Sequence, residues 1–200
     1  ALGYTIDPQH LPTLLENSRM NLDRQVFRLQ VVRWLLEENI PVSLYGNGWT
    51  ELREFAHLAK GPVAPGADLA KVYQRSKVLL HVNTGSNCHM RLFEGIASGG
   101  FVVARACHND SAPGDLASRL EIGKEIMVFS SKDELLDLVR RAFADEPWRR
   151  GVIAAGAQRV RENESYARRV RDIVSDLGEM TARMADSWQT GRGSPATPSH

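Results

Sequence analysis

Apolar residues along the chain follow two patterns that predict two kinds of element. In some segments they return every three or four positions with charged residues between them, which is typical of amphipathic helices. The first such segment runs from Asn21 to Asn39 and ends ahead of Pro41. The same spacing predicts further helices over residues 51–59, 68–75, 90–98, 132–144, from Pro147 onward, and 166–184.

Shorter, mostly apolar runs lie between these helices and predict strands. They cover residues 40–44, 77–82, 101–104 and 125–129, whereas 108–123 shows no regular pattern. Strands that are apolar on both faces and alternate with helices favour a parallel sheet covered on both sides. We therefore expect an α/β fold, a doubly wound, Rossmann-like parallel sheet with a helical C-terminal extension. Only Leu2–Ile6 offers a strand ahead of the first helix.

The composition indicates one ordinary globular domain. Residues 1–184 are expected to form it, and residues 185–200, which are rich in Gly, Ser, Thr and Pro towards their end, a disordered tail. A net charge of +1 gives no basic excess of the kind that a nucleic-acid-binding protein usually shows. No apolar run is long enough to span a bilayer, so the expected location is the cytoplasm.

Two strand-to-helix connections are candidates for a ligand site, because ligands of such folds bind beyond the carboxyl ends of the strands. The first is the glycine turn Gly46, Asn47, Gly48 and Trp49. Glycines let a backbone approach a ligand closely, and the helix that follows offers free N–H groups to an anion. A plain tight turn explains the same residues equally well.

The second connection, Asn83 to Gly100, carries more chemistry. On a helix that starts near His89, the side chains of Arg91 and Glu94 share one face. Arg91 suits a diphosphate and Glu94 two neighbouring sugar hydroxyls, so a nucleoside diphosphate fits both. The alternative is a surface ion pair between Arg91 and Glu94 with His89 as helix cap.

At these residues the sequence resembles a known family. The stretch from His89 to Phe101, preceded by Leu44 to Trp49, is similar to the carboxyl-terminal half of GT-B glycosyltransferases, group 1, of the spore-maturation-protein-B type. The later stretches 123–126, 133–135 and 164–169 also resemble that family, and the similarity covers about Leu22 to Leu177.

The resemblance implies a domain that binds the nucleotide half of a UDP- or GDP-linked sugar, with neither a cofactor nor a metal. In the family pattern Glu94 binds the ribose hydroxyls, Arg91 clamps the diphosphate and His89 adds a third contact. The expected binding positions are Gly46, Asn47, Gly48, Trp49, Asn83, Ser86, Gly99 and Gly100. Ser86 stands where many relatives carry a first glutamate. A complete enzyme of this type also needs an amino-terminal domain, which usually holds the acceptor.

Other functions remain open. The main alternative is a non-catalytic module, derived from a glycosyltransferase, that binds a nucleotide sugar or a protein; an unrelated, flavodoxin-like phosphate binder is a further one. Cys88 and Cys107 match no zinc-site spacing and are interpreted as free thiols. The arginines of the last third alternate with acidic residues, which indicates a solvated helix face rather than RNA binding.

Overall fold

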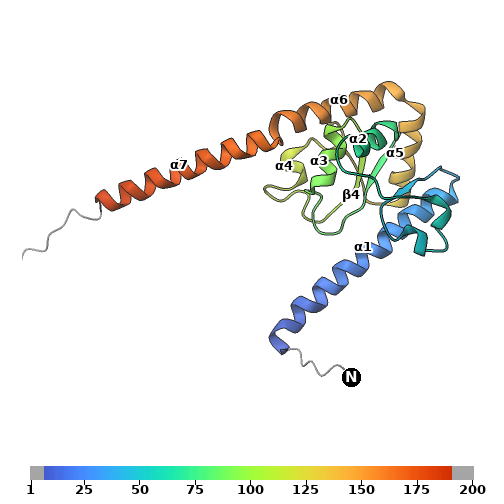
Figure 1. Cartoon of the computed structure of the whole chain (residues 1–200), viewed down its shortest axis with the longest axis horizontal. Helices are drawn as coiled ribbons and strands as arrows, with labels where there is room; N and C mark the ends of the chain where they lie inside the picture. Colours follow the sequence, from blue (N-terminus) through green and yellow to red (C-terminus); the bar gives the residue numbers. More distant parts are fainter. Residues whose placement is uncertain (1–6, 191–200) are drawn as a thin grey trace, which may run out of the picture. The chain divides into compact units, whose positions relative to one another are not determined.

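The computed structural model describes residues 7–190, which form two compact units that divide between Arg159 and Val160 (Figure 1). The strands are β1 (Leu44–Tyr45), β2 (Ala59–Gly61), β3 (Leu79–His81), β4 (Val102–Arg105) and β5 (Met127–Phe129). The α-helices are α1 (Leu11–Glu37), α2 (Ala67–Arg75), α3 (Met90–Ala97), α4 (Leu116–Arg119), α5 (Lys132–Ala144), α6 (Glu146–Asn163) and α7 (Tyr166–Thr190). Short 3₁₀ turns cover Pro8–His10, Trp49–Glu51 and Ala56–Leu58.

All strands of the first unit pair in parallel. Strands β3, β4 and β5 form a three-stranded sheet in that order, and β1 and β2 form a separate two-stranded sheet. In the larger sheet Val103 of β4 lies opposite Leu80 of β3 and Met127 of β5. The carboxyl ends of these strands, His81, Arg105 and Phe129, therefore lie at one edge, which we call the carboxyl edge.

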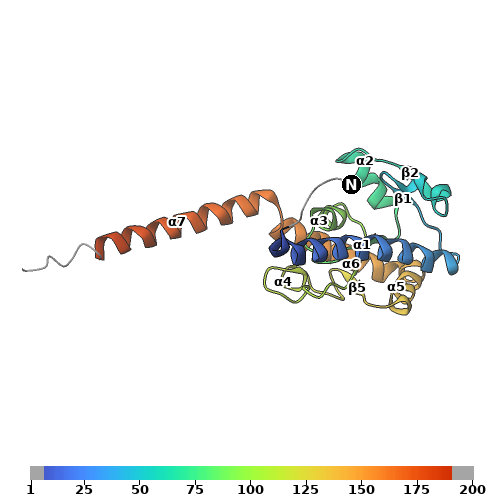
Figure 2. The ribbon, with the colours of Figure 1, turned by 90° about the horizontal axis from the view of Figure 1, so that it is seen from below.

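Helices cover both faces of the three-stranded sheet. On one face Phe101 and Val103 are buried with residues of α1 and α5, and α1 runs across the front of the unit in Figure 2. On the other face α3 lies so close that a Cβ at Gly95 would stand 3.4 Å from side-chain atoms of Leu79 and Val102. The predicted α/β fold with a parallel, doubly covered sheet is confirmed.

The end of α3 shows why two adjacent glycines stand there. Gly99 has a φ of +85°, and the N–H groups of Gly99 and Gly100 donate to the carbonyls of Ile96 and Gly95. This is the Schellman arrangement, in which a left-handed glycine ends a helix. A Cβ at Gly100 would overlap the Cδ1 of Leu79. Both glycines thus serve helix termination and packing.

Most of the predicted elements are present, but the strand predicted from Ile40 is limited to β1, Leu44–Tyr45, and one predicted helix is wrong. Residues 51–59 do not form one helix but parts of two 3₁₀ turns, followed by β2, which the sequence did not predict. Phe55 is buried with Val32 and Leu44, and Glu54 makes two hydrogen bonds of 2.8 Å to Arg33 of α1. This anchoring and the pairing of β2 with β1 replace helical hydrogen bonds.

The ends of the chain differ from the prediction in extent. Helix α1 begins ten residues before the predicted Asn21, at Leu11; Val31, Val32 and Leu35 near its end are buried, whereas Leu11, Leu22 and Val26 are exposed. Helix α7 continues to Thr190, into the predicted tail, whereas residues 191–200 and the candidate strand Leu2–Ile6 lie outside the described residues. None of the helices in the described part of the chain is both long and apolar enough to cross a membrane.

Candidate functional site

The loop between β3 and α3 forms the centre of the candidate site. Because α3 returns antiparallel to the strands, its amino-terminal end lies at the carboxyl edge. The Nδ2 of Asn83 donates to the carbonyl of Ser86 at 2.7 Å, and the Oδ1 of Asn83 accepts from the N–H of Thr84 at 3.0 Å. The Asn83 side chain thus closes a tight turn directly after β3. Both polar atoms of its amide bond to backbone groups of this loop.

A second loop, which follows β4, is tied to the first by buried polar groups. The Asn87 side chain is fully buried, and its Nδ2 donates to the carbonyl of Arg105 at 2.7 Å and to the Asp110 carboxylate at 3.0 and 3.1 Å. The Ser86 hydroxyl donates to Asp115 at 2.9 Å and accepts from the N–H of Cys88 at 3.0 Å. The two loops therefore form one cross-tied structure.

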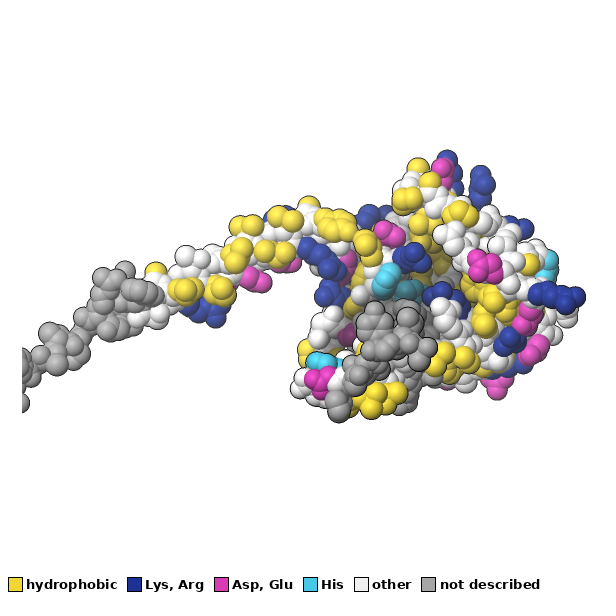
Figure 3. Space-filling model, turned by 60° about the horizontal axis from the view of Figure 1, so that its bottom comes forward, with side chains coloured by type: hydrophobic (Ala, Val, Ile, Leu, Met, Phe, Trp, Pro, Cys, Tyr) yellow, Lys and Arg dark blue, Asp and Glu magenta, His cyan; other side chains and the backbone are white. Residues whose placement is uncertain are grey.

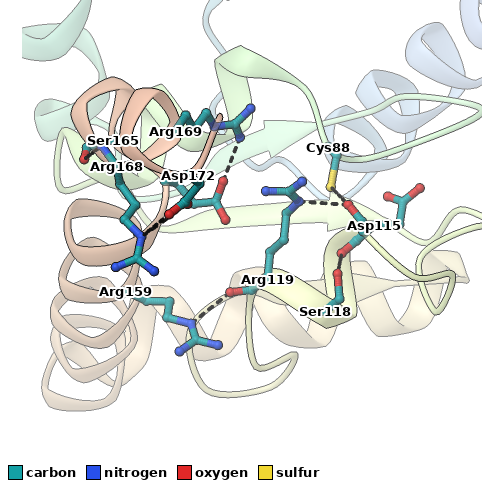
Figure 4. Close-up of polar contacts among 11 residues, drawn as sticks. Cys88, Asp115, Ser118, Arg119, Arg159, Ser165, Arg168, Arg169 and Asp172 are labelled. Atoms are coloured by element: carbon teal, nitrogen blue, oxygen red, sulfur yellow. Dashed lines mark hydrogen bonds and ion pairs between the residues drawn. The ribbon is translucent and has the colours of Figure 1, made fainter. Parts of the chain in front are cut away.

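Further contacts hold the second loop on α4. Figure 4 shows the sulfur of Cys88 and the guanidinium of Arg119 pointing to the same stretch; both contact the carbonyl of Gly114, at 3.7 and 2.8 Å. The carbonyl of Arg119 accepts from Arg159 of α6 at 2.9 Å. Helix α4 is thereby anchored from both ends.

His89 caps α3. Its Nδ1 accepts a hydrogen bond of 3.3 Å from the N–H of Arg91, the second residue of the helix. An accepting Nδ1 carries no proton, so in this geometry the neutral ring holds its proton on Nε2 and can donate it. One part of the alternative interpretation, His89 as helix cap, is therefore present in the structure.

Arg91 and Glu94 lie on the exposed side of α3. Within residues 7–190, the structure records no ion pair between them, although both side chains are exposed. Their charges act on Tyr73 of α2: burial first, and then Glu94, raises the pKa of Tyr73, while Arg91 opposes this shift. The carboxylate and guanidinium are thus both close to one half-buried phenol and available to a ligand.

His81, at the end of β3, is a half-buried member of the site. Its Nε2 has no hydrogen-bond partner among the described residues, and its ring centre lies 6.2 Å from that of His89. Burial, followed by the electrostatic influence of His89, Arg28 and Arg91, lowers the pKa of His81 to about 4. The ring is therefore neutral near pH 7 in surroundings that are electropositive.

Arg105 brings a further cation to the same edge. It ends β4, and its guanidinium carbon lies 3.5 Å from the ring centre of Phe27, so that α1 is held across the carboxyl edge by a cation–π contact. Basic groups from several elements thus meet at this edge: Arg28, His81, His89, Arg91 and Arg105. Together with the amino-terminal end of α3, they suit an anionic ligand.

The other predicted residues lie elsewhere. The turn from Gly46 to Trp49 follows β1 in the two-stranded sheet, with φ angles of +108° and +85° at Gly46 and Gly48. The Trp49 Nε1 donates to the carbonyl of Tyr45 at 3.2 Å. Asn47 is exposed in this turn. Gly99 and Gly100 end α3, and so lie at the opposite end of this helix from His89.

Sequence reasoning did not single out Asp110, Asp115, Arg105, Phe27 or Tyr73. Asp110 and Asp115 fall in the segment without a regular pattern, and their roles depend on contacts across 23 and 29 positions. Arg105 could have been noticed as a charged residue directly after an apolar strand. Among the described residues, no group of three or more His, Cys, Asp or Glu side chains is placed to hold a metal ion.

Comparison with known proteins gives one positive result. A family model described as "Glycosyl transferase-like" matches residues 24–175, which include both sheets and all the residues described above for the candidate site. No curated protein matches the chain. The family match agrees with the resemblance that the His89 to Phe101 stretch shows.

Proposed function

Because the chain belongs to the glycosyl transferase-like family, we propose that its first unit binds the donor, a nucleoside-diphosphate sugar, in a glycosyl transfer reaction. The observation that carries this proposal is the gathering of Arg28, His89 and Arg91 around His81, beside the amino-terminal end of α3. Cations and helix N–H groups in one place favour a diphosphate over a neutral ligand.

The proposed contacts follow from the geometry of α3. Arg91 lies in the first turn, where its charge adds to the helix dipole, and it binds the diphosphate. Glu94 lies one helical turn further, about 4.5 Å along the axis. A carboxylate there accepts hydrogen bonds from the two ribose hydroxyls. Because Tyr73 is close to both charges, we place the nucleoside on the side of α3 that faces Tyr73.

The chemical contribution of the site is to the leaving group. When the sugar–phosphate bond breaks, negative charge grows on the diphosphate, and a fixed cation nearby stabilises the transition state more than the ground state. His89 holds its Nδ1 against the helix and offers the Nε2 proton to a phosphate oxygen. The hydrogen bond to the helix fixes the His89 ring before reaction, so this donor needs little reorganisation.

Ser86 affects what the first unit does with the transferred sugar. Its hydroxyl is engaged by Asp115 and by the N–H of Cys88, so it acts as a link between loops and provides no carboxylate to the sugar. We therefore propose that the acceptor, and the groups that activate it, come from a further domain opposite the carboxyl edge, as in two-domain glycosyltransferases.

Calorimetric titration with UDP, GDP, ADP and the free nucleosides tests donor binding. One diphosphate should bind saturably, and Glu94→Ala should weaken it by about 1–3 kcal/mol through the lost charged hydrogen bonds. Arg91→Ala should weaken the diphosphate more than the nucleoside. Arg140→Ala, which removes an exposed ion pair with Glu38, is the matched control. Equal affinity of wild type and Glu94→Ala contradicts the assignment.

A second candidate function is a non-catalytic nucleotide-sugar-binding module, and the engagement of Ser86 favours it. In that case the nucleotide binds with the same dependence on Arg91 and Glu94, but neither transfer nor hydrolysis of the sugar occurs. Incubation of the chain with the nucleotide sugar that binds, followed by chromatography of the released nucleotide, separates the two functions. Release that Arg91→Ala abolishes supports the enzyme.

A further inference from the structure

Asp115 brings a carboxylate to the candidate site from the second loop. One of its oxygens, Oδ1, accepts hydrogen bonds from the Ser86 hydroxyl at 2.9 Å and from the N–H of Leu116 at 3.0 Å. Among the residues that the structure describes, its other oxygen, Oδ2, makes no hydrogen bond or ion pair. The side chain is half-buried, and Figure 4 shows it turned away from Arg119. This oxygen can therefore accept hydrogen bonds from a ligand.

The position of this carboxylate is fixed from two sides before a ligand arrives. Leu116, the next residue along the chain, is fully buried and begins α4. The Ser86 hydroxyl accepts from the N–H of Cys88 at 3.0 Å and so directs its own proton to Asp115. Side chains that are held in this way lose little freedom on binding, and they can contribute to specificity.

The order of groups along the loop and α3 indicates which part of a donor meets Asp115. This step rests on the donor-binding function proposed above, in which Glu94 binds the ribose and Arg91 and His89 bind the diphosphate. The donor then runs from Glu94 towards the beginning of α3. Because the sugar is joined to the far end of the diphosphate, it extends past His89 to the residues that precede the helix. These residues include Ser86, to which Asp115 is bonded.

The sugar is also the part of such a donor whose chemistry suits a carboxylate. Arg28, His89 and Arg91 gather around His81, and histidine and basic side chains lie side by side on this face of the first unit in Figure 3. These groups attract the diphosphate, whereas a carboxylate repels it. Sugar hydroxyls are neutral donors, and their hydrogen bonds to a charged oxygen are stronger than those between neutral groups.

We propose that the Oδ2 of Asp115 accepts hydrogen bonds from hydroxyls of the transferred sugar, and that Ser86 is the positioning residue that holds the carboxylate for this contact. The first unit then selects a donor by its sugar as well as by its nucleotide. A sugar in which the bonded hydroxyl is replaced by hydrogen binds more weakly. Asp115 thereby provides, from the second loop, the carboxylate that Ser86 itself does not provide.

Titration calorimetry of the full chain with nucleotide sugars and with their bare diphosphates tests this contact. The probes are UDP-glucose, UDP-N-acetylglucosamine, GDP-mannose and ADP-glucose, each compared with its own diphosphate. Asp115→Asn keeps the shape of the side chain and should weaken binding of the nucleotide sugar at least about tenfold. The bare diphosphate should bind equally tightly or more tightly, because a negative charge near an anion is lost. A general defect of the site would weaken both.

Three further variants separate the contact from indirect effects. Asp133→Asn removes an equal charge from the exposed first turn of α5 and, as the matched control, should change neither affinity. Ser86→Ala removes a support but leaves the carboxylate, so it should weaken only the nucleotide sugar, and by less than Asp115→Asn does. Ser86→Thr keeps a hydroxyl and should restore binding. Urea unfolding measures whether each variant is folded.

The outcomes distinguish this contact from donor binding itself. If Asp115→Asn weakens the nucleotide sugar and the bare diphosphate alike, or weakens neither, the sugar contact is overturned while donor binding stands. If wild type binds none of the diphosphates and none of the nucleotide sugars, the proposed function fails, and the contact fails with it. Loss confined to the nucleotide sugar supports both.

Discussion

Asn87 joins the two loops of the candidate site, and its removal should destabilise the first unit measurably. The Asn87→Ala variant loses one hydrogen bond to a neutral carbonyl, that of Arg105, and the bonds to the charged carboxylate of Asp110. A neutral bond contributes about 1 kcal/mol and one to a charge about 1.5–3 kcal/mol. The expected loss in the free energy of unfolding is therefore about 2–4 kcal/mol.

Urea unfolding followed by tryptophan fluorescence measures this loss, because Trp34, Trp49 and Trp148 all lie in the first unit and are half-buried. With an m value of about 2 kcal/mol per molar, the unfolding midpoint should fall by roughly 1–2 M. Asn109→Ala, which shortens an exposed neighbour in the second loop, should shift it little. A loss below about 0.5 kcal/mol in Asn87→Ala refutes the reasoning, since it equals an ordinary surface effect.

The Asn87→Asp variant adds a pH signature that a merely structural defect would lack. It places a carboxyl group against Asp110, and because both cannot ionise at this distance, the pKa of the pair rises above the unfolded value. The protonated carboxyl can donate as the amide does. The loss in the free energy of unfolding relative to wild type should thus be small below about pH 4, where the folded and the unfolded chain both bind the proton. It should grow as the pH rises through the raised pKa of the folded state.

Three further outcomes are expected. Gly100→Ala should cost about 1–3 kcal/mol in urea unfolding because its Cβ overlaps Leu79; Gly99→Ala meets no atom within 4 Å and should cost about 1 kcal/mol from its positive φ alone. The folded pKa of His81, about 4, is below its unfolded value. Stability should therefore be constant above about pH 6.5 and fall by up to roughly 3 kcal/mol towards pH 4, and His81→Gln should flatten this profile. Burial raises the pKa of Cys107 to about 11, so its alkylation by iodoacetamide, followed by mass spectrometry of peptides, should be slow at pH 8 and rise about tenfold per pH unit; fast labelling at pH 8 would contradict its burial.

The fold could be predicted largely from local pattern. Helix α5 has the predicted bounds, 132–144, because a serine cap, acidic first residues and regular apolar spacing agree there. Residues 51–59 show the limit of this reasoning. Leu52, Phe55 and Leu58 have helical spacing, but Phe55 is the residue buried in the core. Apolar spacing of three residues suits 3₁₀ turns equally well, and only the contact with α1 decides between them.

The candidate site was predictable where its residues are close in sequence. His89, Arg91 and Glu94 share one helix end, so spacing alone brings them together. The bond between Asn87 and Asp110 spans 23 positions and leaves no local pattern. Arg105 and Phe27 meet from still more distant elements. A single sequence gives no signal for such pairs, because their meeting is decided by strand order and by the path of α1.

The cross-ties between the two loops bear on how this site can be altered. Loops beyond the carboxyl edge are commonly exchanged to change the ligand preference of an α/β domain. Here the loop after β3 cannot be replaced alone, because the loss of Asn87 and Ser86 would take from Asp110 and Asp115 the side-chain donors that tie the two loops together. Residues 82–89 and 106–115 constitute one transferable unit, and variation in ligand preference within such domains should arise through paired changes in both segments.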